Sequence, residues 1–179
     1  LSFVPQKTDL ETDFTAEEIV MTGRTPYQGR FEGTSIGDKE AVYRAFSLTK
    51  ADKLKDKKFA ILSGGEKQKI VIARAVAQTT PWMLLDEPIA SLDIKNQIEI
   101  MQTLSELNRQ EGVSVLMVLH DINLAGIYCD RLIMLKDGQV IAAGNTNECL
   151  CEENLKKLYD ISFFHMDTKK GQRYYYAEI

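Results

Sequence analysis

The sequence predicts an α/β fold in which a parallel sheet adjoins a separate helical layer, and three observations lead to this prediction. Residues 82–85, Trp-Met-Leu-Leu, form a continuous apolar run that is typical of a strand buried on both faces. A second such run occupies 113–119, and residues 95–110 between the two have a helical pattern. Strand, helix and strand in this order imply parallel strands joined by a crossover helix. Residues 12–78 have mainly helical patterns, so two subdomains are expected.

The first half of the chain is expected to hold one strand and the helical layer. Pro5 ends the strand, and Thr15 stands where it would cap the first helix. Four apolar side chains at helical spacing mark the last helix, namely Ile70, Ala73, Val76 and Ala77. The expected elements are a strand end over 1–6, a polar loop from Thr22 to Asp38, and helices over 39–46, 50–54 and 66–78.

The second half continues the sheet and ends in two expected hairpins. The crossover helix over 95–110 should bury one stripe, formed by Ile98, Met101, Leu104 and Leu107. Asp137-Gly138 is a strong hairpin signal. Beyond the second strand the expected elements are a helix over 123–129, hairpin strands over 131–135 and 139–142, a helix from Thr146 to about Tyr159, and paired segments 163–166 and 174–178 across Lys170-Gly171.

Composition indicates an ordinary globular domain of 179 residues, 44% of them apolar and 27% charged. With 22 basic and 26 acidic residues the net charge is −4, which gives no support for a nucleic-acid groove or an anionic membrane surface. No apolar run approaches the ~18 residues needed to cross a bilayer. Cys129, Cys149 and Cys151 include no CxxC pair and are expected to be reduced structural thiols.

A glycine pair at a predicted helix start is the most informative local pattern. In Leu62–Gln68, Ser63 is followed by Gly64 and Gly65, so backbone N–H groups and the helix dipole would converge on one point. Glycines would let the backbone approach an anion closely. Ser63 with Glu66 also fits an ordinary capping box, and the two interpretations are compatible.

Acidic and polar residues follow both predicted sheet strands. Asp86 and Glu87 end the first strand, where an acid could support Mg²⁺ and a neighbour could take a proton from water. An acidic turn of purely structural role is the alternative. His120 follows the second strand and is expected at the same sheet edge, although a lone histidine at a strand end is usually structural. Asp121 is expected to cap the next helix. Residues 91–93, Ser-Leu-Asp, lie where the crossover helix begins.

Together these patterns resemble the ATPase subunits of ABC transporters. Leu62–Gln68 is similar to the signature motif, and Met83–Glu87 to a Walker B strand with its glutamate. Ser91–Asp93 is similar to the D-loop, His120 to the switch histidine, and Gln6 to the Q-loop glutamine. Their order and spacing also match. The resemblance implies an α/β P-loop NTPase (RecA-like) parallel sheet core, incomplete here, with a helical signature subdomain over 12–78, core residues 79–145 and a small α+β extension over 146–179.

The resemblance also implies a role for each matching residue, with ATP and Mg²⁺ as cofactors. Gln6 would touch Mg²⁺ and the attacking water, and Asp86 would support Mg²⁺. Glu87 would be the general base, and His120 would contact the γ-phosphate. Asp93 would lie at a dimer interface, while the signature would contact the nucleotide held by the opposite subunit. The nucleotide-contacting set implied in this way is Ser63, Gly64, Gly65, Glu66, Gln68 and Asp93.

One motif of the family is absent. None of the 11 glycines is followed by Lys, so the sequence contains no P-loop, GxxxxGK[ST], which should precede Gln6. In related sheets the P-loop strand lies between those that match 113–119 and 131–135, so its removal would open the middle of the sheet. We therefore expect a partial chain, from truncation, proteolysis or a split gene, that is inactive alone; a natural pseudo-ATPase is the alternative.

A further similarity concerns the kind of transporter. Residues 20–27, Val-Met-Thr-Gly-Arg-Thr-Pro-Tyr, resemble a segment of importers for iron–siderophore complexes, haem and vitamin B12, as do 120–125 and 144–159. This implies a homodimer at the cytoplasmic face of a bacterial membrane, under two transmembrane permease subunits that a substrate-binding protein feeds. Residues 12–60 would receive the permease, and iron chelate is the expected cargo.

Two other classes remain as alternatives. A DNA-repair type ABC ATPase would need a coiled coil or a zinc insertion between Gln6 and Leu62, or a basic groove, and the sequence has neither. No nucleic-acid partner is therefore expected. A catalytically silent regulatory ABC module would explain the missing P-loop, but the retained Glu87 and His120 argue against it.

Overall fold

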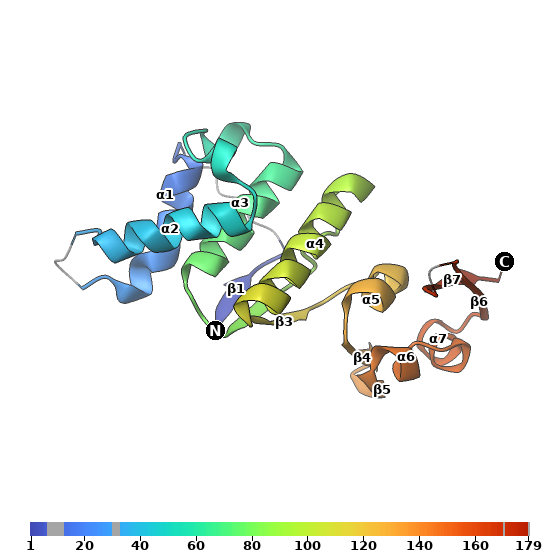
Figure 1. The fold of residues 1–179 in the computed structure, drawn as a ribbon. Helices are drawn as coiled ribbons and strands as arrows, with labels where there is room; N and C mark the ends of the chain where they lie inside the picture. The colour runs from blue at the N-terminus through green and yellow to red at the C-terminus, as the bar shows by residue number, and fades with distance from the viewer. Residues whose placement is uncertain (7–12, 30–32, 170, 179) are drawn as a thin grey trace. The chain divides into compact units, whose positions relative to one another are not determined.

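The computed structural model describes residues 1–6, 13–29, 33–169 and 171–178 (Figure 1). The chain forms two compact units, Leu1–Leu119 and His120–Ile179, and each is described by itself below. In the described residues no helix is both long and apolar enough to span a membrane. The predicted subdomain boundaries at 78/79 and 145/146 stay a prediction.

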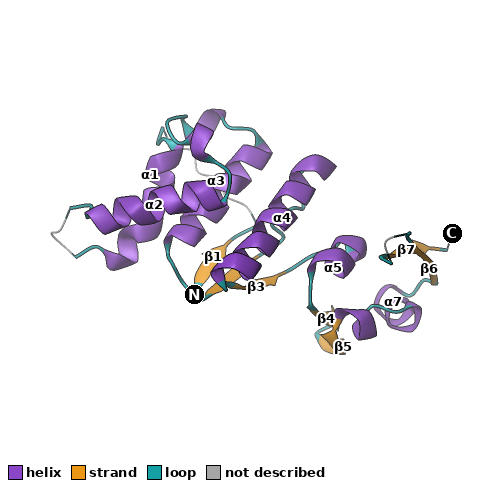
Figure 2. Cartoon of the chain, viewed as in Figure 1, coloured by secondary structure: helices purple, strands orange, loops and turns teal. Residues whose placement is uncertain are grey.

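A three-stranded parallel sheet lies in the first unit (Figure 2). Its strands are β1 (Ser2–Val4), β2 (Trp82–Leu85) and β3 (Ser114–Met117), in the order β1-β2-β3. Helix α4 (Ile94–Glu111) is the crossover between β2 and β3, which confirms the predicted strand–helix–strand unit. The predicted strands, their parallel pairing and the α/β class are therefore confirmed.

The two predicted core strands are not buried on both faces, so this expectation was wrong. Met83 and Leu85 of β2 are buried, but Trp82 and Leu116 are each 53% exposed. The reason is that helix α3 (Gly64–Ala77) packs on β1 and α4 on β3, while these two helices also contact each other. Among the described residues of this unit, helices therefore cover one face of the sheet.

Between β1 and β2 the chain forms a helical layer around α1, α2 and α3 (Figure 1). Thr15 caps α1 in a capping box with Glu18, which confirms the predicted cap. The elements before α3 are α1 (Ala16–Met21), η1 (Thr22–Tyr27), α2 (Ile36–Leu48), η2 (Asp52–Leu54) and η3 (Phe59–Ile61), where η marks a 3₁₀ helix. The largest side chains buried within the layer are Val20, Phe46, Phe59, Ile70 and Ile72.

Two expectations in this layer need correction. The polar loop predicted from Thr22 to Asp38 begins with η1 and ends early, because Ser35 and Asp38 form a capping box that starts α2 at Ile36. Residues 30–32 of that loop lie outside the described residues. The helix predicted over 50–54 is only the short η2, since Lys50 adopts a left-handed backbone with φ of 55° and interrupts the helical path.

The apolar stripe of α4 is shifted from the predicted one. Met101, Leu104 and Leu107 are buried as expected, but Ile98 is 37% exposed, and Ile100 is buried in its place. Because α4 is covered by α3 and by the sheet together, its buried surface is wider than a single line of residues. Gly112, with φ of 67°, ends the helix in a left-handed cap.

The described residues of the second unit form two hairpins and three short helices. Both predicted hairpins are confirmed, β4 with β5 and β6 with β7. Its core cluster consists of Met134, Cys149, Leu150, Leu155 and Tyr175, and all three cysteines of the chain are free thiols. The elements are α5 (Ile122–Tyr128), β4 (Arg131–Lys136), β5 (Gln139–Asn145), α6 (Thr146–Cys149), α7 (Glu152–Tyr159), β6 (Phe163–Asp167) and β7 (Arg173–Ala177).

The single helix predicted from Thr146 to Tyr159 is in fact two helices. Asn145 rather than Thr146 is the cap, because the Asn145 side chain accepts from the amide of Asn147. The helical path breaks at Leu150, whose ψ of 85° is not helical, and Cys151 is extended. Buried Leu150 packs into the core of the unit, which compensates for the break. Lys170, in the second predicted turn, lies outside the described residues.

Candidate functional site

Three polar residues lie at the carboxyl ends of β1 and β2. Asp86 and Glu87 directly follow β2, and Gln6 lies two residues after β1. The parallel register fixes the positions of these residues along the strands, because Val4 is opposite Leu85. The Val4 carbonyl accepts a hydrogen bond from the amide of Asp86 at 2.9 Å. Gln6 Nε2 donates to Glu87 Oε2 at 2.6 Å, across 81 positions of sequence. The sheet thus brings Gln6 and Glu87 into direct contact.

Glu87 has an unusual backbone conformation. Its φ is 45°, in the left-handed region that a residue with a side chain rarely adopts. Such a conformation costs about 1–3 kcal/mol and tends to persist where the position of a side chain matters for function. Buried Pro88 follows, and the amide of Ala90 donates to the carbonyl of Glu87 at 3.3 Å, which closes the turn. The turn marks Glu87 as a candidate functional residue.

The donor set at this sheet edge fits Mg²⁺ held together with a nucleotide. No group of three or more His, Cys, Asp or Glu side chains in the described residues could hold a metal ion by itself. Mg²⁺ is commonly bound by one or two carboxylates, with phosphates and waters completing its shell. Asp86 and Glu87 can supply carboxylate oxygens and Gln6 an amide oxygen, so the chemistry of the residues fits that mode.

The start of α3 is a capping box, as the sequence suggested. Ser63 Oγ accepts from the amide of Glu66 at 3.4 Å, and Glu66 Oε2 accepts from the amide of Ser63 at 2.9 Å. Hydrogen bonds that the amide and the hydroxyl of Ser63 donate to the Glu66 carboxylate lower the pKa of Glu66, with a smaller contribution from Lys57. Ser63 and Gly64 are exposed. The helix start is therefore both capped and accessible, so a capping box and the close approach of an anion are compatible here. Gln68 follows one turn later on α3.

Gly65 has a packing reason that the sequence did not indicate. A Cβ at this position would overlap the side-chain amide of Asn96 in the first turn of α4, whereas at Gly64 the nearest atom would be Leu92 Cδ2 at 3.8 Å. Asn96 Nδ2 also donates to Asp93 Oδ2 at 2.7 Å, and the Asn96 amide donates to Asp93 Oδ1 at 2.9 Å. These bonds lower the pKa of Asp93. Asn96 therefore connects Asp93 to Gly65.

His120 is the first residue of the second unit. It comes three residues after β3 ends at Met117, and its predicted placement beside Asp86 and Glu87 stays a prediction. Asp121 accepts from the amides of Asn123 and Leu124 and caps α5, which confirms the capping role expected for it.

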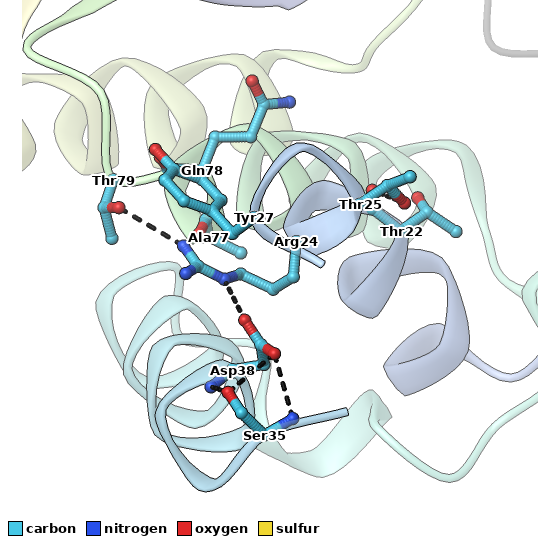
Figure 3. Close-up of polar contacts among 9 residues, drawn as sticks. All are labelled: Thr22, Arg24, Thr25, Tyr27, Ser35, Asp38, Ala77, Gln78 and Thr79. Atoms are coloured by element: carbon cyan, nitrogen blue, oxygen red, sulfur yellow. Dashed lines mark hydrogen bonds and ion pairs between the residues drawn. The ribbon is translucent and has the colours of Figure 1, made fainter. Parts of the chain in front are cut away.

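The other end of α3 is held by η1 (Figure 3). Arg24 Nη1 donates to the carbonyl of Ala77, the last residue of α3, at 2.7 Å. Its Nε donates to Asp38 Oδ1 on α2 at 2.9 Å, and its guanidinium lies 4.0 Å from the centre of the Tyr27 ring. The side chains of Arg24 and Asp38 are 11% and 6% exposed, so the ion pair is nearly buried.

Sequence reasoning missed Arg24 and its partner Asp38, and it also missed Asn96. Arg24 belongs to the segment 20–27, which was interpreted only as a marker of transporter type. Its partner Asp38 is 14 positions away, a separation at which no sequence pattern links a basic to an acidic residue. Asn96 stands three residues after Asp93, which is a weak sign of a capped helix start, but nothing in the sequence connects it with Gly65.

Solved structures with the same fold define the class of protein. A transporter described as of metal-chelate type, in an inward-facing conformation, is 26% identical with a TM-score of 0.93 and covers 99% of this chain and 72% of that chain. The dimeric ATP-binding cassette MJ0796, bound to ADP and Pi, is 33% identical with a TM-score of 0.67, over 81% of this chain and 62% of that chain. The fold is that of an ATP-binding cassette, a P-loop NTPase.

Sequence comparisons then define the family. Residues 1–90, half of the chain, match the family described as ABC transporter, and the chain belongs to this family. The ferric enterobactin transport ATP-binding protein FepC of Escherichia coli (strain K12) is 38% identical over 167 residues. The petrobactin import ATP-binding protein FpuC of Bacillus anthracis is 38% identical over 161 residues. They match 93% and 90% of this chain, which spans 62% and 59% of their own lengths.

Proposed function

We propose that these residues belong to the ATP-hydrolysing subunit of an ABC importer for iron chelates. The observation that carries the proposal is the direct contact between Gln6 and Glu87 at the sheet edge, beside Asp86. A hydrolytic site of this family needs a base and a group that positions it, and this contact supplies both. Membership of the ABC transporter family supports the same conclusion.

Each residue of the proposed hydrolytic site would have a separate role in catalysis. Glu87 would accept the proton of a water molecule at the moment that water attacks the terminal phosphate, and Gln6 would hold the Glu87 carboxylate through the 2.6 Å hydrogen bond. Asp86 would hold Mg²⁺, which neutralises phosphate charge during transfer. His120 would contact the transferred phosphate. Because such catalysis depends on positioning, the fixed register of β1 and β2 matters directly.

A second copy of the subunit would complete each site. In this proposal Ser63, Gly64 and Gly65 approach the nucleotide held by the partner, with Glu66 and Gln68 in the same helix start and Asp93 at the dimer interface. The dimeric state of the similar cassette MJ0796 supports this arrangement. ATP would be bound by the whole protein, in which these residues act together with a phosphate-binding loop, beneath transmembrane permease subunits at the cytoplasmic face of the membrane.

The cargo class rests on the relatives. FepC and FpuC are named for ferric enterobactin and petrobactin, and other similar proteins for achromobactin and iron(3+)-hydroxamate, all of them iron chelates or their ligands. A cobalamin import protein of Halobacterium salinarum is also 37% identical, so the comparison favours metal chelates as a group. Growth on a ferric siderophore as the iron source, with and without the gene, would test this assignment.

The test of the ATPase proposal is the variant Glu87→Gln in the product of the complete reading frame. The amide cannot take a proton, so we expect turnover to fall at least about 100-fold while ATP-dependent dimerisation persists. Phosphate release and size-exclusion chromatography with light scattering would measure the two properties. Unchanged turnover would remove Glu87 from the role of base. The surface variant Glu106→Gln, on α4 and paired with Lys50, is the matched control and should behave as the unaltered protein.

A further inference from the structure

We propose that Arg24 is a positioning residue for α3, the helix that begins with the signature-like residues Ser63, Gly64 and Gly65. From the C-terminal end of α3, Arg24 fixes the direction in which these three residues approach the nucleotide of a partner subunit. This inference rests on the proposed function of the helix start. It assigns a role to the η1 segment, which the sequence marked only as typical of one group of importers (Figure 3).

The first support is the set of bonds at the C-terminal end of α3. The last carbonyls of a helix have no partners within the helix. Here Arg24 Nη1 donates to the carbonyl of Ala77 at 2.7 Å and to Thr79 Oγ1 at 3.3 Å, while Tyr27 Oη donates to the carbonyl of Gln78 at 2.6 Å. A positive charge at this end also interacts favourably with the helix dipole. Two side chains of η1 thus fix the end of α3.

The second support is the nearly buried ion pair of Arg24 with Asp38. Asp38 is itself held by the hydroxyl and the amide of Ser35, at 2.7 Å and 3.0 Å from its Oδ2, so the carboxylate has little freedom to move. One guanidinium therefore joins η1, α2 and the end of α3. Removing one partner of a buried pair leaves the other charge without compensation, which destabilises the fold. The connection is accordingly stiff.

The third support is the close approach of the two backbones. A Cβ on Gly23 would overlap the carbonyl oxygen of Arg74, so only glycine allows η1 to lie this close to α3. Gly23 is buried in this contact. This backbone contact, together with the bonds of Arg24 and Tyr27 to the end of α3, restrains α3 relative to η1.

These contacts at the C-terminal end of α3 affect Ser63 at its N-terminal end, because a helix tilts as a rigid body. With 14 residues it is about 20 Å long, so a tilt of about 3° at one end moves the other by about 1 Å. A misplacement of that size can cost about 100-fold in a reaction that depends on positioning. Arg24, which lies at the opposite end of α3 from Ser63, would therefore influence the contact that Ser63 makes.

The experiment measures ATP-dependent dimerisation of the product of the complete reading frame in the Glu87→Gln background. Adding Arg24→Met should raise the ATP concentration for half-maximal dimer about tenfold, because α3 loses its anchor. Arg24→Lys, which keeps the charge without the planar fork, should give an intermediate value. Binding of a fluorescent ATP analogue to the monomer should change less than about twofold, since the subunit's own nucleotide does not touch its own signature.

Two further variants separate positioning from general stability. Arg44→Met is the matched control, because Arg44 also pairs with an acid of the same unit, Glu111, but is 64% exposed; its dimerisation should be unchanged. Tyr27→Phe removes only the bond to Gln78 from a half-exposed side chain, so it should fold normally and still raise the ATP requirement about threefold. Wild-type ATP requirements in Tyr27→Phe and in folded Arg24→Met would overturn the proposal. If the background protein never dimerises with ATP, the proposed function itself is contradicted.

Discussion

Asn96 shows how one side chain can connect Gly65 and Asp93, which are 28 positions apart in sequence. Its amide group lies against the α-carbon of Gly65, and its Nδ2 donates to Asp93 Oδ2. A glycine at the second helical position of α3 is therefore required by the contact with α4, in addition to any close approach of an anion. If Asp93 lies at a dimer interface as proposed, a displacement of its side chain would also move Asn96 and thereby change the contact with Gly65.

The variant Gly65→Ala tests this contact. Asn96 would have to rotate away and give up its bond to Asp93, so we expect the free energy of unfolding to fall by about 1–3 kcal/mol. Gly64→Ala is the matched control and should be neutral, because its Cβ would make ordinary contact with Leu92. Adding Asn96→Ala to Gly65→Ala should recover about 1 kcal/mol in a double-mutant cycle. Urea unfolding of these three variants and of Asn96→Ala alone provides the measurements; equal stability of Gly65→Ala and Gly64→Ala would contradict the argument.

At the scale of elements, α2 and α3 depend on one carboxylate. Asp38 caps α2 with Ser35 and pairs with Arg24 at the end of α3. The hydrogen bond from the Ser35 hydroxyl, followed by those from Arg24 and from the Ser35 amide, lowers the pKa of Asp38 below its ordinary value. The ionised form therefore stabilises the folded protein, and this stabilisation must disappear in acid.

The pH dependence of unfolding follows from that lowered pKa. The contribution of Asp38 is fully present above its unfolded pKa of about 3.9 and is lost as the pH falls through the lower folded value. Asp38→Asn should be less stable than the unaltered chain near pH 6, and the gap should narrow below about pH 4. Urea unfolding from about pH 6 to about pH 3 measures the gap. A gap that does not change with pH would show that Asp38 is not the titrating group.

Local patterns predicted most elements, and tertiary contacts explain the exceptions. Short-range chemistry determined the caps at Thr15, Ser63 and Asp121 and the Asp137-Gly138 turn, so the sequence sufficed for them. The break at Leu150 depends on a core that forms only when distant elements meet. The same holds for the site: strand ends placed Asp86 and Glu87, but Arg24 bonds to α2 and α3, and Asn96 of α4 contacts Gly65 of α3.

At the scale of the whole molecule, the question is whether these 179 residues can bind ATP by themselves. They contain the sheet edge and the signature helix but no P-loop sequence. We therefore expect titration calorimetry of the 179-residue chain with Mg-ATP to give no saturable heat, because these residues include no GxxxxGK[ST] sequence whose backbone amides and lysine would hold the phosphates. The product of the complete reading frame is the positive control. Micromolar affinity in the shorter chain would show that phosphate binding does not need a P-loop here.

The sequence separation between β1 and β2 has a consequence for synthesis in the cell. Ser2 pairs with Met83, and the whole helical layer lies between them. At about 5–20 residues per second, the ribosome makes β2 roughly 4–16 s after β1. During that interval Phe3, which remains half exposed even in the finished unit, belongs to a strand whose partner β2 has not yet been made. Early folding of the helical layer would bring the two strand ends together and shorten the time during which nascent β1 is available to chaperones and to other chains.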